Sequence, residues 1–279
     1  NTDLILLSMY GDEGLRAAQL KSDFLNVQFQ SYLSYRDVYS YVYNFMMTYI
    51  PLLYDDSAEK RPMSREYEVD NTMVKITAGE KINEFLDAIA SSLLVAPDTE
   101  AYLAFSPSAN KMMMRGSSEA LEYRGVIMAN TSFNIDKKIK DSLSLWLESS
   151  CVYVGSRPLM PDFTITGGAR ENRASIRAGF ESEDGKASGM LGFKANFSRD
   201  SLTHRRNMHL DITPSHFTND SVQWRLLSRG IDIESSRISI NQLRLIHPGQ
   251  QLIVDGVVSR SREDELLLTL DNFDISPLS

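Results

Sequence analysis

Apolar and polar residues alternate with a period of two along most of this chain. The clearest stretch runs from Ser236 to Leu278 and contains three strand-like segments separated by two turns. In Gln251–Val258 and Glu265–Phe273 the even positions are mainly apolar, whereas the odd positions include Asp255 and Thr269. Alternation of this kind between turn residues predicts half-buried antiparallel strands.

The same pattern continues from residue 99 onward and predicts a mainly β fold. Candidate strands recur roughly every 10–15 residues, as in a meandering antiparallel sheet. A β-bulge is expected near Asn241-Gln242, because the apolar positions are even up to Ile240 and odd from Leu243. Turn-forming residues predict breaks between strands at Gly116-Ser117-Ser118, Gly167-Gly168, Asp184-Gly185, Thr213-Pro214-Ser215 and Pro248-Gly249.

Two segments have helical rather than strand periodicity. Asp37–Ile50 is rich in tyrosine and is followed by Pro51, and Glu80–Leu94 has one apolar stripe. The tyrosines suit a helix that lies on an apolar surface with its hydroxyl groups toward water. The alternative for the first helix, an interfacial membrane helix, lacks the polar face rich in Lys and Arg that such helices carry.

The charged, aperiodic residues 54–65 predict a linker. Residues 1–53 would then hold upstream strands and the tyrosine-rich helix, and residues 66–279 would form one long sheet segment that includes the helix at 80–94. The chain starts at Asn1 without an initiator Met or a signal peptide, and we interpret it as an internal fragment of a longer polypeptide.

Composition removes several classes of function. A net charge of −8 argues against a nucleic-acid partner, because such domains usually have a basic face. The single cysteine, Cys151, excludes a scaffold built on disulfides. No apolar run is long enough to form a membrane-spanning helix.

No motif for catalysis or cofactor binding stands out. His204, His209, His216 and His247 do not form a ligand set, so surface histidines are expected in place of a metal site. The acidic clusters fall in turns and linkers, where solvated charge is expected. Met112-Met113-Met114 fits either ordinary core packing or an adaptable lipid-contacting surface. We therefore expect no catalytic residue, no metal and no cofactor, and a protein that is not an enzyme.

A long sheet with one apolar face must cover that face. It can fold onto a second sheet, close into a barrel, or curl around another apolar object. The alternation alone leaves these three possibilities open.

The closing stretch resembles a known family. A Pro-Gly turn, the run Gln-x-Leu-x-Val-Asp-Gly-x-Val-Ser, and then Leu-x-Leu-x-Asn-Phe-Asp-Ile-Ser-Pro-Leu are similar to AsmA-like, bridge-like lipid transfer proteins, and closely to the TamB translocation and assembly module family in Bacteroidetes-type chains. The residues that carry the resemblance are Gln251, Leu252, Val254, Asp255, Gly256, Ser259, Leu266, Leu268, Leu270, Asn272, Phe273, Asp274, Ile275 and Leu278.

The resemblance implies a fold and a function that alternation does not. It implies a long, curved, U-shaped antiparallel sheet (a half-pipe or β-taco) with an apolar concave face. The whole protein would be anchored in the inner membrane by an N-terminal segment absent from this chain, and would cross the periplasm toward an Omp85-class outer-membrane partner. Its expected work is phospholipid transport between the two membranes and support of outer-membrane protein assembly.

On this interpretation phospholipid acyl chains lie along the apolar parities of the strands. Two alternatives remain open: a strand-pairing module for outer-membrane protein assembly or secretion, and a plain structural β-sandwich. The proposed groove-lining residues are Leu143, Leu145, Leu147, Ile176, Phe180, Met208, Leu210, Ile212, Val222, Trp224, Leu226, Leu252, Val254, Val258, Leu266, Leu268 and Leu270.

Overall fold

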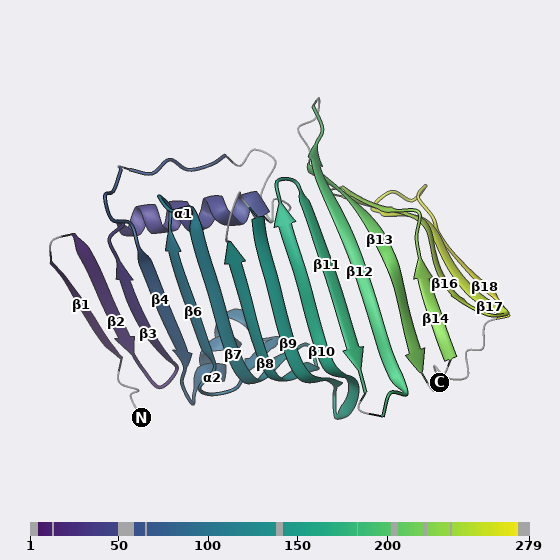
Figure 1. Ribbon diagram of the computed structural model, residues 1–279, viewed down its shortest axis with the longest axis horizontal. Coiled ribbons are helices and arrows are strands. Elements are labelled where there is room, and N and C mark those ends of the chain that lie inside the picture. The colour runs from purple at the N-terminus through teal and green to yellow at the C-terminus, as the bar shows by residue number, and fades with distance from the viewer. Residues whose placement is uncertain are drawn as a thin grey trace. The chain divides into compact units, whose positions relative to one another are not determined.

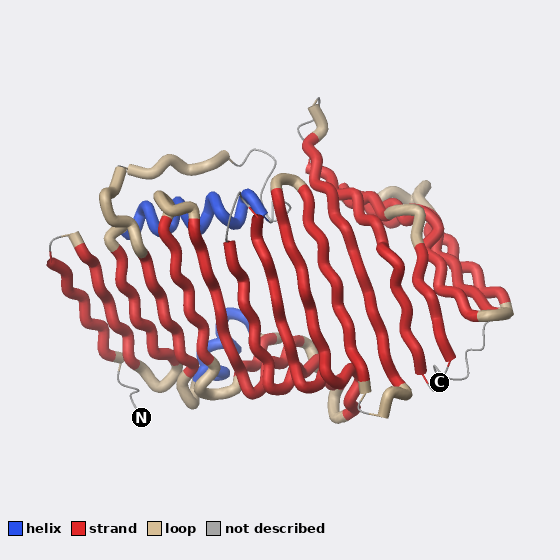
Figure 2. The backbone as a smooth tube through the Cα atoms, viewed as in Figure 1, coloured by secondary structure: helices blue, strands red, loops and turns tan. Residues whose placement is uncertain are grey.

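The computed structural model describes residues 5–12, 14–49, 59–64, 66–137, 142–182, 184–201, 206–219, 222–234 and 236–272. Within these ranges the protein is mainly β, with 18 strands in one antiparallel sheet and two short helices (Figures 1 and 2). This confirms the fold class expected from the alternation. Four predicted features lie wholly or partly outside the described residues: Pro51, positions 54–58 and 65 of the linker, His204, and the motif from Phe273 onward.

The chain forms two compact units, which are described separately. Unit 1 comprises Asn1–Thr48 and Glu59–Thr166, and unit 2 comprises Tyr49–Ala58 and Gly167–Ser279. The described part of the predicted linker, residues 59–64, contains neither helix nor strand.

Unit 1 contains both helices, and its strands pair in the order β1-β2-β3-β4-β6-β7-β8-β9, with β5 also paired to β7. Strand β10 pairs with β9 and continues from unit 1 into unit 2. The elements are β1 (Leu6–Asp12), β2 (Leu15–Lys21), β3 (Leu25–Ser31), α1 (Tyr35–Tyr49), β4 (Thr72–Ala78), α2 (Ile82–Ala90), β5 (Leu93–Val95), β6 (Glu100–Ser106), β7 (Lys111–Tyr123), β8 (Val126–Lys137), β9 (Ser142–Val154) and β10 (Arg157–Arg170).

Apart from Tyr49, the last residue of α1, the regular elements among the described residues of unit 2 are all strands. β11, β12 and β13 pair in sequence order; β14 and β15 then pair with different parts of β13 and of β16, and β17 and β18 follow. The strands are β11 (Arg173–Glu181), β12 (Ala187–Arg199), β13 (Arg206–Asn219), β14 (Val222–Leu227), β15 (Ile231–Glu234), β16 (Arg237–His247), β17 (Gln250–Ser259) and β18 (Leu266–Asp271).

The buried core of unit 1 lies beneath α1. Leu33, Phe105 and Met112 are buried together, and Val38, Tyr41, Val42 and Phe45 of the helix pack against them. The rings of Tyr41 and Phe105 stack at 4.5 Å between centroids. Figure 1 shows α1 crossing the strands near one of their ends. The helix therefore lies on an apolar surface of the sheet, as its tyrosine-rich pattern predicted.

The second helix is shorter than predicted. It ends at Ala90, and Leu93-Leu94, expected to be helical, belongs to β5. The amide of Asn83 exchanges two hydrogen bonds with the backbone of Val95, at 2.9 and 3.0 Å. Because β5 also pairs with β7, these non-local hydrogen bonds override the local helical pattern.

Three of the five predicted turns lie inside long strands. Gly116-Ser117-Ser118 is in β7, Gly167-Gly168 in β10, and Thr213-Pro214-Ser215 in β13. A Cβ at Gly116 would lie 2.5 Å from the ring of Phe133 on the next strand, so this glycine makes room for an aromatic side chain. The hairpin at Asp184-Gly185 and the bulge near Asn241-Gln242 are confirmed.

No helix among the described residues is long and apolar enough to cross a membrane.

Candidate functional site

The strand register of unit 2 brings the predicted groove residues together. Cross-strand partners in an antiparallel pair project from the same side of the sheet. Ile176 lies opposite Phe193, and Phe193 lies opposite Ile212. The three side chains therefore share one face across β11, β12 and β13.

Two further rows extend this face toward the end of the described chain. One row runs from Met208 through Ile233 and Ile238 to Val258, across β13, β15, β16 and β17. A neighbouring row, in the same order of strands, runs from Leu210 through Ile231 and Ile240 to Gly256, and ends at Leu266 of β18.

A further row of apolar side chains crosses β14, β16, β17 and β18. Leu226 lies opposite Leu245, which lies opposite Leu252 and then Leu270. Trp224 stacks on Phe217 at 6.1 Å. We call this set the apolar face of unit 2. It contains the predicted residues Ile176, Phe180, Met208, Leu210, Ile212, Val222, Trp224, Leu226, Leu252, Val254, Val258, Leu266, Leu268 and Leu270.

None of these side chains is buried. Most are half-buried, and the side chain of Leu268 is 58% exposed. The opposite parity carries exposed polar residues such as Arg177, Lys194 and Thr269, although Ile253 and Leu267 are exceptions near the end of the sheet. Contiguous apolar surface left open in this way marks a site of interaction more often than a resting surface.

The remaining predicted residues, Leu143, Leu145 and Leu147, lie in unit 1. They are half-buried on β9, and Leu145 and Leu147 lie opposite Ile135 and Phe133. The corresponding face of unit 1 is covered by α1 at Phe105 and Met112. In unit 1 the helix therefore shields part of the apolar surface.

The three consecutive methionines have different environments. Met112 is buried in the core under α1. Met113 lines a pocket of about 570 Å³ in unit 1, together with Leu15, Met73 and Ala104. Met112 is thus a core residue that also borders the pocket lined by Met113.

The capping role of Asp37 was missed by the sequence interpretation. Its carboxylate is completely buried, and it accepts hydrogen bonds from Ser34 Oγ at 2.8 Å and from the Ser64 amide at 2.6 Å. The hydroxyl groups of Ser64 and Tyr67 donate to it as well. Burial raises the pKa of Asp37, but the hydrogen bonds outweigh burial and hold the pKa well below its ordinary value of 3.8.

The sequence contains a signal for this arrangement. Ser34 and Asp37 have the spacing of a capping box, and the Asp37 amide donates to Ser34 Oγ at 3.2 Å. Asn44 exchanges two hydrogen bonds with the backbone of Arg61, at 2.7 and 2.8 Å. Arg61, Ser64 and Tyr67 are thus bound to side chains of α1 by hydrogen bonds.

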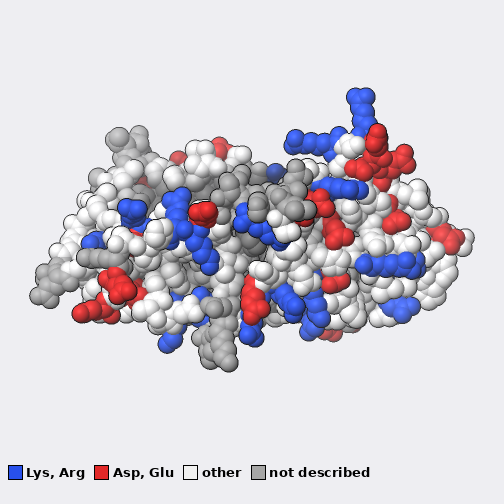
Figure 3. All heavy atoms as spheres, turned by 90° about the horizontal axis from the view of Figure 1, so that it is seen from above, with Lys and Arg blue, Asp and Glu red and all other residues white. Residues whose placement is uncertain are grey.

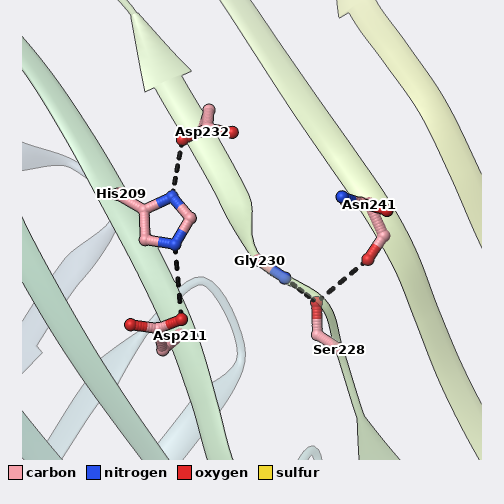
Figure 4. A network of polar contacts seen from close by, with 6 residues as sticks. All are labelled: His209, Asp211, Ser228, Gly230, Asp232 and Asn241. Carbon is pink, nitrogen blue, oxygen red and sulfur yellow. Dashed lines mark hydrogen bonds and ion pairs between the residues drawn. The ribbon is translucent and has the colours of Figure 1, made fainter.

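Of the predicted surface histidines, His209 has the closest charged partners (Figure 4). Its Nδ1 lies 2.6 Å from Asp232 Oδ1, and its Nε2 lies 3.3 Å from Asp211 Oδ1. The hydrogen bond to Asp232 raises the pKa of His209, against a smaller opposing effect of burial. The described residues contain no cluster of His, Cys, Asp and Glu suited to a metal ion.

We expect the pKa of the His209 imidazole to lie above its ordinary value of 6.5. Because the folded pKa is raised, this contact stabilises the fold fully below the unfolded pKa and loses its effect as pH rises through the folded pKa. An NMR titration of the ring protons should show the upward shift, and Asp232→Asn should reduce it. The control is Lys186→Gln, which removes a charge from unit 2 at a distance from His209. This variant should leave the midpoint of the His209 titration unchanged. A midpoint unaffected by Asp232→Asn would contradict the assignment.

Charge is distributed differently from the apolar residues. On the side of the molecule shown in Figure 3, basic and acidic side chains are interspersed. No protein-family model, no curated protein and no solved structure matches this chain with significance, so the interpretation of the site depends on the chain's own residues.

Proposed function

We propose that this chain is a periplasmic segment of a TamB-like, AsmA-like protein and forms part of a hydrophobic groove for phospholipid. The observation that supports this most directly is the continuous row of cross-strand apolar partners in unit 2, left half-exposed on one face. Acyl chains placed there would be stabilised by about 25 cal/mol per Å² of apolar surface removed from water, without directional contacts.

The proposal includes a curved sheet whose apolar face is concave. Curvature lets apolar side chains of different strands surround an acyl chain, while the polar parity stays in water. The inner-membrane anchor, the Omp85-class partner and the periplasmic location come from the resemblance of the closing motif. They form part of the proposal on that basis.

A charge on the apolar face tests the groove. We expect Leu268→Glu to lower co-purified phospholipid by about tenfold, since an unfavourable 1.4 kcal/mol corresponds to a tenfold loss of binding. Leu268 lies opposite Val254, halfway along β18. The matched control is Thr269→Glu, which places the same charge on the next residue and the opposite parity. Lipid is measured by mass spectrometry of the purified protein.

Two outcomes would contradict the groove. One is wild-type protein that carries no phospholipid. The other is equal loss of lipid in Leu268→Glu and Thr269→Glu. A photo-crosslinker at Val254 adds an independent readout, because it should capture acyl chains in the wild-type background.

A second candidate function is strand pairing with an outer-membrane protein substrate. Among the described strands β18 pairs with β17 alone, and all six of its residues are exposed. It carries no proline, and such an unprotected apolar edge is a template for an added strand. Two crosslinking results together would favour this function. A crosslinker at Leu267 would capture β-barrel segments, and a crosslinker at Val254 would capture no lipid. A compact monomer that captures neither would favour a structural β-sandwich.

A further inference from the structure

A row of backbone irregularities crosses unit 2. The first is in β13, where the pairing with β12 shifts between Met190 and Gly192. Gly192 pairs with Thr213 and Met190 with His216, so two residues of β13, Pro214 and Ser215, oppose one residue of β12. This is a β-bulge, one of the few places in a sheet where proline is tolerated.

The second irregularity is a break in the next row of the sheet. β13 pairs with β15 at Leu210 and with β14 from Ser215 onward, so residues 228–230 lie in the gap between the two short strands. Ser228 Oγ accepts from the Gly230 amide at 3.0 Å, and the Arg229 amide donates to the Asn241 carbonyl at 3.0 Å. Figure 4 shows Ser228 and Gly230 beside Asn241 of β16.

The third irregularity is the bulge in β16. Ile240 pairs with Gly256 and Leu243 with Val254, so Asn241 and Gln242 oppose Asp255 alone. Gln242 has a φ of 47°, and its amide donates to Asp255 Oδ1 at 3.0 Å. The Gln242 amide has no cross-strand partner in the bulge, and the Asp255 carboxylate accepts its hydrogen bond instead.

The register places these three features side by side. The bulge of β13 adjoins the gap at residues 228–230, this gap adjoins Asn241, and Asn241-Gln242 adjoins Asp255. The line ends at β18, where Gly256 pairs with Leu266. We call this row the bulge line. It also explains the Val-Asp-Gly part of the closing motif: the carboxylate satisfies the bulge, and the glycine has no Cβ to collide with the Glu265 carbonyl.

We propose that the bulge line is a crease, along which the sheet of unit 2 bends toward its apolar face, and that Asp255 holds the bend. Bulges bend a strand and increase its local twist. A single bulge acts on one strand, whereas aligned irregularities bend neighbouring strands at the same level. The crease divides the apolar face into two strips, with Met208 and Ile238 on one and Phe217 and Leu245 on the other.

Unit 1 contains interrupted ladders as well, although these have no register shift. The ladders of β7 with β8 and of β8 with β9 skip Asn130, which has a φ of 44°. Two buried hydroxyl groups lie beside it: Ser118 Oγ donates to the Ala120 carbonyl at 2.8 Å, and Ser149 Oγ donates to the Ala129 carbonyl at 2.7 Å. A polar side chain that satisfies an interrupted ladder is thus a recurring feature of this protein.

The crease deepens the proposed function, because it would set the cross-section of the groove, but it can be tested without lipid. Spin labels at Ser198 and Arg225, both exposed on the polar parity, lie on different strips; labels at Ser198 and Glu234 lie on one strip. Distances are measured by pulsed electron spin resonance in the full chain, with Cys151→Ala as background. Asp255→Ala should shorten and broaden the Ser198–Arg225 distance, because flattening brings outer-face labels closer. The Ser198–Glu234 distance should not change.

Two further variants complete the test. Asp255→Asn keeps an oxygen acceptor for Gln242 and should retain the wild-type distance. Ser228→Ala removes the acceptor of the Gly230 amide, and it should shorten the Ser198–Arg225 distance as Asp255→Ala does. This second variant keeps the proposal testable if Asp255→Ala does not fold. Unchanged distances in both alanine variants would overturn the crease.

The two proposals fail in different ways. Distances that respond as expected in a protein that carries no phospholipid would support the crease and overturn the groove. Distances that do not respond in a protein that carries phospholipid would overturn the crease alone.

Discussion

Asp37→Ala is expected to destabilise unit 1 by about 3 kcal/mol, because several donors lose one shared, buried acceptor at once. The Ser64 amide and the hydroxyl groups of Ser34 and Tyr67 all point at this carboxylate. Hydrogen exchange of α1 and of residues 60–67 should accelerate by about a hundredfold, since each 1.4 kcal/mol corresponds to a factor of ten. Hydrogen-exchange mass spectrometry of the two segments measures the effect.

Asp87→Ala provides the matched control. Asp87 is an exposed carboxylate on the other helix, α2, and its loss should change stability by less than about 0.5 kcal/mol. Tyr67→Phe removes one of the donors and should give a smaller loss than Asp37→Ala. Equal exchange rates in wild-type and Asp37→Ala protein would show that residues 61–67 are held by other contacts.

The same carboxylate predicts sensitivity to acid. Its folded pKa is lowered, so its contribution to stability is fully present above the unfolded pKa of about 3.9 and is lost as pH falls through the folded pKa. The wild-type protein should therefore lose α1 protection below about pH 4, and Asp37→Ala should show a flatter dependence on pH in that range.

Gly256→Ala should destabilise unit 2 by about 3 kcal/mol, for two reasons that act together. Gly256 has a φ of 122°, which residues with a Cβ rarely adopt. A Cβ built there would lie 2.3 Å from the backbone oxygen of Glu265, so β17 and β18 would have to separate. Urea unfolding measures the loss, followed by the fluorescence of Trp224 in a Trp146→Phe background, because Trp146 lies in unit 1.

Gly249→Ala separates the two causes. Gly249 also has a positive φ, 82°, but no atom lies within 4 Å of its built Cβ. Only the backbone preference is lost there, and the expected cost is about 1 kcal/mol. Similar losses in the two variants would show that the close approach of Glu265 does not decide the stability of β17 and β18.

The outcome for the apolar face shows how far sequence reasoning reaches. Leu252, Val254 and Leu268 could be assigned to one parity from the sequence, because alternation within a strand is a local property with a period of two. Their position beside Leu226 and Ile238 could not be assigned, because it depends on the register of strands that are distant in sequence.

Three of the five predicted turns were wrong for a related physical reason, whereas those at Asp184-Gly185 and Pro248-Gly249 are present. Glycine and serine favour turns in isolation, but Gly116 lies inside β7, where it makes room for Phe133 of β8. Thr213-Pro214-Ser215 lies in a bulge and not between strands. In both cases the neighbouring strand decides the role of the residue, and the neighbour cannot be read from the local sequence.

The sequence by itself determined the mainly β class, the apolar parity of most strands, the presence of both helices and the bulge at Asn241-Gln242, because each follows from periodicity within about ten residues. Only the tertiary structure decided that Asp37 of α1 binds Ser64 and Tyr67, and that Asp255 accepts the hydrogen bond of the Gln242 amide in the bulge of β16. These depend on hydrogen bonds between backbone and side-chain groups that the fold brings together. Local pattern therefore selects the elements, whereas burial and register select the roles of the polar residues between them.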